Sequence, residues 1–125
     1  DKRNYRRFRI KTVEGIDDPA AIAEVVNRRY RRLIREGSEF PDLVMVDGGR
    51  TQLQAAVSAL RGLNCIIPVI ALAKREEQIF IAGSAHPLPV AKQEKASLYL
   101  QEIRDEAHRF AITYHRLLRK KKAMA

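Results

Sequence analysis

Residues 42–50 read Asp42-Leu43-Val44-Met45-Val46-Asp47-Gly48-Gly49-Arg50. A continuous apolar run that follows Pro41 and ends in two glycines is typical of a strand buried on both faces of a sheet. Asp47 is then the first polar side chain at the carboxyl end of that strand, where open α/β sheets bind their ligands. Two interpretations stay open at this point: a functional carboxylate, or an ordinary aspartate that caps the next helix.

The overall charge predicts a polyanionic partner. The 125 residues contain 24 Lys and Arg against 15 Asp and Glu, which gives a formal net charge of +9. A domain this basic usually binds nucleic acid, and an anionic membrane surface or an acidic protein is the alternative. No apolar run approaches the roughly 20 residues that span a bilayer, so we expect no membrane insertion. The single cysteine, Cys65, lies in an apolar stretch, which favours a reducing, cytoplasmic location.

Alternating and continuous apolar runs predict further strands. Residues 5–13 alternate, which predicts an antiparallel strand with a basic outer face and a hairpin partner upstream of the chain. The basic face suits a phosphate backbone or, equally, a charged edge that blocks aggregation. Residues 66–73 and 78–81 predict a hairpin over a charged turn, and residues 84–93 predict a loop.

Helical spacing of apolar residues predicts three helices. The first covers residues 19–36, with Asp18 at the N-cap position, and the second covers residues 50–63. The third runs from about residue 94 to a lysine-rich end. The resulting order β, α, β, α, β, β, α predicts an α/β domain with a mixed sheet over residues 1–119. Residues 120–125 then form a basic tail or linker.

The residues that remain as candidates for chemistry suggest a divalent cation. Zinc-type spacings of His and Cys, a nucleophile elbow and a phosphate-binding loop are all missing from the sequence. Asp47 at a strand end, Asp18 at a helix start and His108 on the last helix are left. Carboxylates beside a basic surface suit Mg²⁺ or Mn²⁺ acting on a phosphodiester. The alternatives are a helix cap for Asp18 and an ordinary surface histidine for His108.

Several motifs closely resemble one family, the C-terminal endonuclease domain of the bacterial excinuclease component UvrC. The motifs are Val-Asp-Gly-Gly-Arg-x-Gln-Leu at 46–53, Ala-Lys-Arg at 73–75, Ile-Arg-Asp-Glu-Ala-His-Arg-Phe-Ala-Ile at 103–112, Tyr-Arg-Arg-Phe at 5–8, Asp-Asp at 17–18 and Arg-Arg-Tyr at 28–30. They occur in the family's order along the whole chain. Arg50-Thr51 stands where the family often has Lys-Gly, a departure that keeps the basic charge.

The resemblance implies a fold and a reaction. It implies an RNase H-like fold, hydrolysis of a DNA phosphodiester, and the 5′ incision beside a lesion in nucleotide excision repair. Asp47 and His108 match catalytic residues that act with one divalent ion, Mg²⁺ or Mn²⁺, and Asp18 matches a further acidic position. The histidine is a metal ligand or a proton carrier, and these two roles stay open. We further predict that DNA contacts come from four basic residues: Arg50, Lys74, Arg75 and Arg104.

The family's first catalytic aspartate has no match in this sequence. It belongs to the family's opening strand, so we expect the domain to lack its first strands and to cut little or no DNA alone. Damaged double-stranded DNA is the expected substrate. The UvrB protein is the expected partner, through other parts of the full-length protein. The second hypothesis is a non-catalytic nucleic-acid-binding module on the same fold, and a third is a protein-interaction domain that binds an acidic partner.

Overall fold

The computed structural model describes residues 9–84, 86–89, 102–103, 105–109, 112 and 116. Its elements are β1 (Ile10–Val13), α2 (Pro19–Glu36), β2 (Leu43–Asp47), α3 (Arg50–Gly62), β3 (Val69–Ala73), β4 (Gln78–Ile81) and β5 (Leu88–Pro89). Helical backbone also occurs at Glu102, Ile103, Asp105–Arg109, Ile112 and Arg116. We call Asp105–Arg109 the C-terminal helical turn. No helix in the described ranges is long and apolar enough to cross a membrane.

The strands form one mixed sheet in the order β1-β2-β3-β4-β5. The first three strands run parallel, and β4 and β5 are antiparallel to their neighbours. The register pairs Val13 with Val46, and Asp47 with Leu72. The predicted α/β fold with a mixed sheet is therefore confirmed. Three parallel strands end together at one side of the sheet, which we call the carboxyl edge.

The parallel pairing of the first strand was not predicted. Among the described residues β1 pairs in parallel with β2, and the predicted hairpin partner upstream of the chain stays a prediction. The physical reason is the crossover: α2 carries the chain back along the sheet, so β2 restarts in the direction of β1. Residues 5–8, which the prediction also assigned to this strand, lie outside the described residues.

A short strand occurs where a loop was predicted. Leu88 and Pro89 form β5, which pairs with Ile79 and Gln78 of β4. Two residues are too few to show an alternating pattern, and a proline inside a segment argues against a strand. The hairpin of β3 and β4 was predicted correctly. Most of the predicted third helix and the tail at 120–125 lie outside the described residues.

α2 begins and ends as the sequence predicted, whereas α3 begins at Arg50 as predicted and ends at Gly62, one residue before the predicted end. Asp18 is the N-cap of α2, where its Oδ1 accepts a hydrogen bond of 3.2 Å from the Ala20 nitrogen, and Pro19 occupies the first turn. Gly37 ends α2 in the left-handed conformation, with φ of 66°. α3 follows Asp47 after only two glycines. The short connection therefore holds the start of α3 beside the end of β2.

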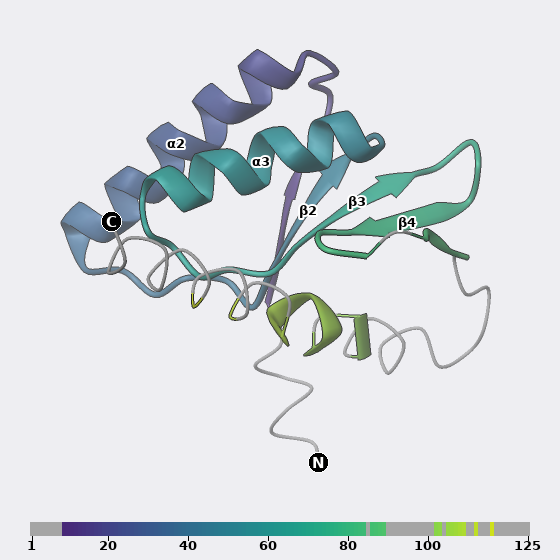
Figure 1. Ribbon diagram of the computed structural model, residues 1–125. Coiled ribbons are helices and arrows are strands. Elements are labelled where there is room, and N and C mark those ends of the chain that lie inside the picture. The colour runs from purple at the N-terminus through teal and green to yellow at the C-terminus, as the bar shows by residue number, and fades with distance from the viewer. Residues whose placement is uncertain are drawn as a thin grey trace, which may run out of the picture.

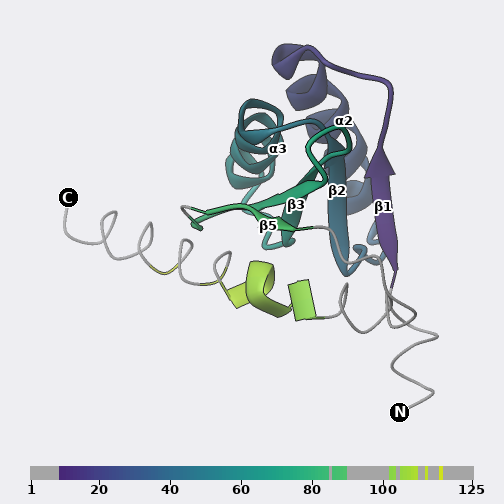
Figure 2. The ribbon, with the colours of Figure 1, turned by 90° about the vertical axis from the view of Figure 1, so that its right-hand side faces the viewer.

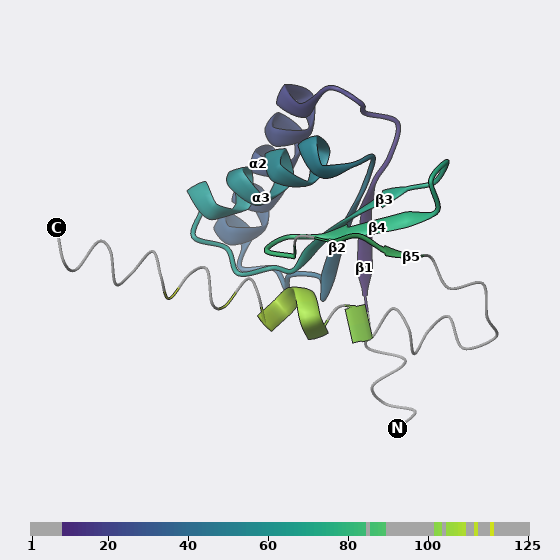
Figure 3. The same cartoon turned by 45° about the vertical axis from the view of Figure 1, so that its right-hand side comes forward.

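The sheet separates two apolar layers. α2 and α3 cover one face, and the C-terminal helical turn lies across the other (Figures 1 and 3). Along β2, Val44 and Val46 pack into the layer under the two helices, whereas Leu43 and Met45 pack into the opposite layer. Because side chains of a strand alternate between faces, Asp47 belongs to the same face as Leu43 and Met45.

Candidate active site at the carboxyl edge of the sheet

A shallow hollow lies at the carboxyl edge, where β1, β2 and β3 end. Its lining residues are Thr12, Glu14, Met45, Val46, Asp47, Leu72 and Lys74. The carboxyl ends of parallel strands are the usual place for a ligand in an open α/β sheet, because the chain leaves each strand there and exposes polar groups. Asp47 is therefore located where the sequence predicted a functional carboxylate.

The backbone after Asp47 turns in a way that only glycine permits. Gly48 has φ of 135°, and a Cβ atom built on it would lie 2.7 Å from Cγ of Gln52. The Gly48 nitrogen donates a hydrogen bond of 3.0 Å to the Leu72 oxygen, which continues the pairing of β2 with β3 for one residue. The turn keeps Asp47, which is half-buried, beside the end of β3.

Gln52 fixes two backbone segments at this edge. Its Oε1 accepts a hydrogen bond of 2.9 Å from the Gly49 nitrogen, and its Nε2 donates one of 3.0 Å to the Asp17 oxygen. The loop after β1 is thereby tied to the start of α3. Gln52 belongs to the 46–53 motif, but its role was not predicted, because a hydrogen bond from a helix to a loop 35 residues earlier in the chain leaves no local sequence pattern.

A second carboxylate lines the hollow, and sequence reasoning did not identify it. Glu14 follows Val13, the last residue of β1, and Val13 is paired with Val46. The next residues along the chain are Glu14, just after β1, and Asp47, at the end of β2, and both line the hollow. The signal was present in principle, since Glu14 is the first acidic residue after an alternating strand. It was hidden by the antiparallel assignment of β1.

Asp18 lies in the loop tied to α3 but does not line the hollow. It is exposed, and one of its carboxylate oxygens caps α2. The structure therefore gives this residue the capping role that the sequence analysis held as the alternative. A catalytic role for Asp18 stays a prediction.

The four basic residues predicted to contact DNA have different surroundings. Lys74 lines the hollow and Arg75 is exposed in the turn between β3 and β4. Arg50 begins α3, where its guanidinium lies 5.0 Å from the ring centroid of Phe80 and its Nη1 donates a hydrogen bond of 3.0 Å to the Ser84 oxygen. Arg50 thus holds the end of β4 against α3. Arg104 lies outside the described residues.

His108 lies on the same face of the sheet as Asp47, but it does not line the hollow. The neighbouring Ala107 packs in the apolar layer that includes Leu43 at the start of β2, and Met45 and Leu72 of the hollow pack against the same layer. Figures 1 and 2 show the C-terminal helical turn below the sheet, toward the ends where β1 and β2 begin. His108 is half-buried and is not among the residues that line the hollow, so a site that it shares with Asp47 stays a prediction.

The donor set of the hollow suits a hard cation and a phosphate. Glu14 and Asp47 supply carboxylate oxygens, the ligands that Mg²⁺ and Mn²⁺ prefer, and Lys74 supplies an ammonium group for an anionic oxygen. Across the described parts of the chain, no three or more His, Cys, Asp or Glu side chains group closely enough to hold a metal ion. Two carboxylates are within the number that Mg²⁺ takes from a protein, since this ion keeps several of its waters.

Comparison with known proteins identifies the family. A family model described as the UvrC RNase H endonuclease domain matches residues 1–112. This chain belongs to that family. The resemblance drawn from the motifs is confirmed, and the mixed sheet with flanking helices agrees with an RNase H-like domain.

Similar proteins include archaeal and bacterial members of one protein type, the UvrABC system protein C. The chain is 61% identical to the protein from Methanosarcina barkeri and 63% identical to that from Methanococcus maripaludis, in each case over 97% of this chain and 23% of the relative. It is 52% identical to the protein from Chlorobium chlorochromatii over 94% of this chain and 19% of the relative. The chain thus spans about a fifth to a quarter of the length of these relatives.

Proposed function

We propose that this chain is the nuclease domain of an excision-repair protein and hydrolyses a phosphodiester of damaged DNA to make the 5′ incision. The observation that carries the proposal is the position of Asp47 in a hollow at the carboxyl edge, within a chain of the UvrC endonuclease family. The net charge of +9 supports a nucleic-acid substrate. The relatives' name, UvrABC system protein C, supports a role in nucleotide excision repair together with UvrB.

The residues of the hollow would have different roles in the reaction. Asp47 and Glu14 would hold one Mg²⁺ or Mn²⁺ ion, which supplies an activated water and shields the charge of the phosphate. Lys74 would bind an oxygen of the same phosphate and orient the bond to be cut. His108, as second ligand or as proton carrier, stays a prediction.

We also propose that the chain by itself cuts DNA weakly or not at all. The family's first catalytic aspartate has no counterpart in this sequence, and Glu14 is one residue beyond β1 and exposed. Mixing the chain with supercoiled plasmid and Mn²⁺ should leave the plasmid closed. Efficient nicking that Asp47→Ala abolishes would refute weak cutting and would support the nuclease assignment at the same time.

A thermal-shift titration with Mn²⁺ tests the metal site directly. Because the ion binds the folded chain, an Mn²⁺ concentration ten times the Kd adds about 1.4 kcal/mol to the free energy of unfolding and raises the Tm. The rise should disappear in Asp47→Asn and shrink in Glu14→Gln. Glu76→Gln is the matched control, because Glu76 is an exposed carboxylate in the turn after β3 and outside the hollow. The same Tm rise in Asp47→Asn as in the unchanged chain would exclude the site.

The second candidate is a non-catalytic nucleic-acid-binding module on the same fold. The net charge of +9 favours it, because basic side chains alone can bind a phosphate backbone without a metal ion. Such a module would bind DNA with a strong salt dependence and would show no Mn²⁺ response in any variant. The two candidates therefore predict opposite outcomes in the same titration.

A further inference from the structure

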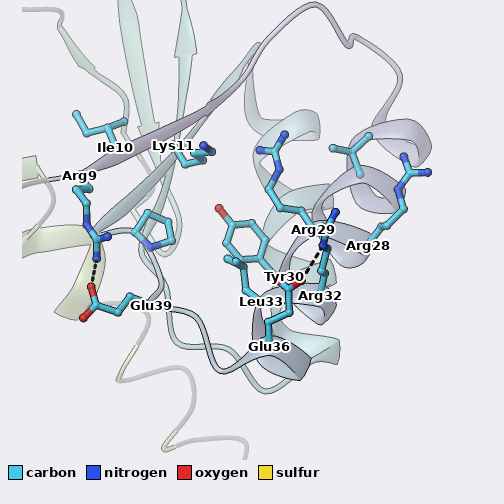
Figure 4. Close-up of a pocket in the computed structure, with 12 residues that line it drawn as sticks. Arg9, Ile10, Lys11, Arg28, Arg29, Tyr30, Arg32, Leu33, Glu36 and Glu39 are labelled. Atoms are coloured by element: carbon cyan, nitrogen blue, oxygen red, sulfur yellow. Dashed lines mark hydrogen bonds and ion pairs between the residues drawn. The ribbon is translucent and has the colours of Figure 1, made fainter.

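A groove of about 780 Å³ runs between β1 and α2, on the face of the sheet opposite the hollow. The sequence reasoning gave it no function. Arg9 and Lys11 line one side, and Arg28, Arg29 and Arg32 line the other. Figure 4 shows Lys11 and Arg29 extending toward each other across the groove, while Arg28 points away from β1.

Tyr30 is the most informative residue of the groove. Its side chain is fully buried, with 0% of its surface exposed, and its ring packs edge-on against Phe40 with 6.3 Å between centroids. Tyr30 is nevertheless among the residues that line the groove, and its buried hydroxyl points toward the side where Lys11 and Arg29 lie (Figure 4). The hydroxyl has no hydrogen-bond partner among the described residues. A buried hydroxyl without a partner is costly, so the arrangement points to a partner that these residues do not supply.

One side-chain nitrogen of Arg29, Nη1, is also buried without a hydrogen-bond partner among the described residues. Burial raises the pKa of Tyr30, whereas the charge of Arg29 and a hydrogen-bonding interaction of the Arg29 side chain with the phenol oxygen lower it, so the two groups lie close to each other. A guanidinium can only donate, and the proton of a phenol needs an acceptor of its own. An acceptor with several oxygen atoms between Arg29 and Tyr30 would satisfy both.

The charged residues of the groove form two groups: those at its rim form ion pairs, and those at its centre can donate hydrogen bonds. At the rim, Arg9 pairs with Glu39 at 2.9 Å and Arg32 pairs with Glu36 at 3.2 Å. Within the described residues, no ion pair engages Lys11 or Arg29. The centre of the groove is therefore a cluster of two cations and one hydroxyl, each with a proton to donate, which matches a phosphate group.

We infer that the groove between β1 and α2 binds the phosphodiester backbone of one DNA strand, with Tyr30 and Arg29 donating to one phosphate and Lys11 to its neighbour. The inference rests on the proposed function in one respect, namely that the ligand is DNA. Arg, Lys and Tyr side chains are common phosphate contacts that position a strand without reading its sequence. The site should therefore contribute affinity to every DNA sequence equally.

The test measures binding of a fluorescent 20-nucleotide single strand to the whole chain by anisotropy, in EDTA and at several salt concentrations. Arg29→Gln should weaken binding about tenfold and reduce the slope of log K against log salt by roughly 0.7, the value for one phosphate contact on a single strand. Tyr30→Phe should weaken binding less than tenfold and leave the salt slope unchanged, because the hydroxyl is neutral. Arg31→Gln is the control, since Arg31 is an exposed arginine of α2 that bonds Asn27 and lies outside the groove.

Stability measurements separate a binding role from a structural one. In the absence of DNA, Tyr30→Phe should leave the Tm unchanged or raise it, because it removes an unpaired buried hydroxyl. A lowered Tm together with unchanged DNA affinity would overturn the inference. Equal weakening by Arg31→Gln and Arg29→Gln would also overturn it, since net charge alone would then explain the binding. If millimolar inorganic phosphate abolishes binding of the oligonucleotide, the groove binds free phosphate and not a DNA strand, and the inference is overturned.

The binding test is independent of cleavage, because EDTA removes the metal ion. Loss of affinity in Tyr30→Phe and Arg29→Gln with no Mn²⁺ response at Asp47 would support the groove and refute the nuclease. An Mn²⁺ response that depends on Asp47, with no change of affinity in the groove variants, would support the nuclease and refute the groove. A chain that binds no oligonucleotide at low salt would refute the groove outright.

Discussion

The side-chain amide of Gln52 is hydrogen-bonded to the backbone oxygen of Asp17, at 3.0 Å, and so joins the loop after β1 to the start of α3. The same amide accepts from the Gly49 nitrogen at 2.9 Å. The carboxylates of Glu14 and Asp47 lie on the two segments that this one side chain connects. The relative position of these two carboxylates therefore depends on a residue that contributes no charge.

Replacing Gln52 by Ala should lower the free energy of unfolding by about 1–3 kcal/mol, because two hydrogen bonds are lost and each is worth about 0.5–1.5 kcal/mol net. Urea unfolding followed by circular dichroism measures the change. Gln54→Ala is the matched control on the same helix, where the side chain is exposed and the change should stay within about 0.5 kcal/mol. An equal effect of both substitutions would show that helix propensity, and not the bridge, is responsible.

Gly48→Ala should cost about 1–3 kcal/mol, since Gly48 has φ of 135° and the added Cβ would lie 2.7 Å from Gln52 Cγ. Gly62→Ala provides the comparison within α3, because a Cβ there meets nothing within 4 Å. That substitution should be neutral or stabilising by up to about 1 kcal/mol. Thermal unfolding of the two variants should therefore shift the Tm in opposite directions, or at least differ clearly. A neutral Gly48→Ala would contradict the strained turn.

Asp18 can be tested with two substitutions that separate its cap from its charge. Asp18→Ala removes the acceptor for the Ala20 nitrogen and should destabilise the fold by about 0.5–2 kcal/mol. Asp18→Ser keeps a capping oxygen and should retain most of the stability. If Asp18 only caps α2, both variants should keep the Mn²⁺ response. A stable Asp18→Ser variant without that response would instead assign the carboxylate to the metal site.

Alkaline pH should destabilise the protein through Tyr30 and Cys65. Burial raises the pKa of both groups in the folded state, whereas in the unfolded chain the thiol ionises near about 8.5 and the phenol near about 10. The free energy of unfolding therefore has its full value below about pH 8.5. It falls as the pH rises through the pKa of each group in the folded state, because the unfolded chain releases these protons at lower pH. Urea unfolding at pH 8 and pH 10.5 should show a smaller loss in Tyr30→Phe and in Cys65→Val. An unchanged loss in both variants would assign it to other groups.

The elements that the sequence predicted well are those with local signals. β2 was recognisable from its apolar run, α2 from its cap at Asp18 and its end at Gly37, and the position of Asp47 from the end of that strand. The direction of β1 was not predictable in this way, because the pairing of a strand depends on the crossover and not on the strand's own pattern. Glu14 was missed for the same reason, since its proximity to Asp47 follows from parallel pairing.

The hydroxyl of Tyr30 illustrates a second limit of sequence reasoning. A tyrosine at helical spacing among apolar residues predicts a core position, and the ring of Tyr30 is indeed buried. Whether its oxygen atom has a partner depends on what β1 places opposite α2. Only the arrangement of the two elements reveals that the oxygen lies in a groove beside Arg29.

Consecutive residues of β1 serve opposite faces of the sheet: Lys11 lines the groove beside α2, and Thr12 lines the hollow beside Asp47. A slip of β1 by one residue against β2 would exchange them and move a cation from one surface to the other. A single residue inserted within β1 would thus change both surfaces together.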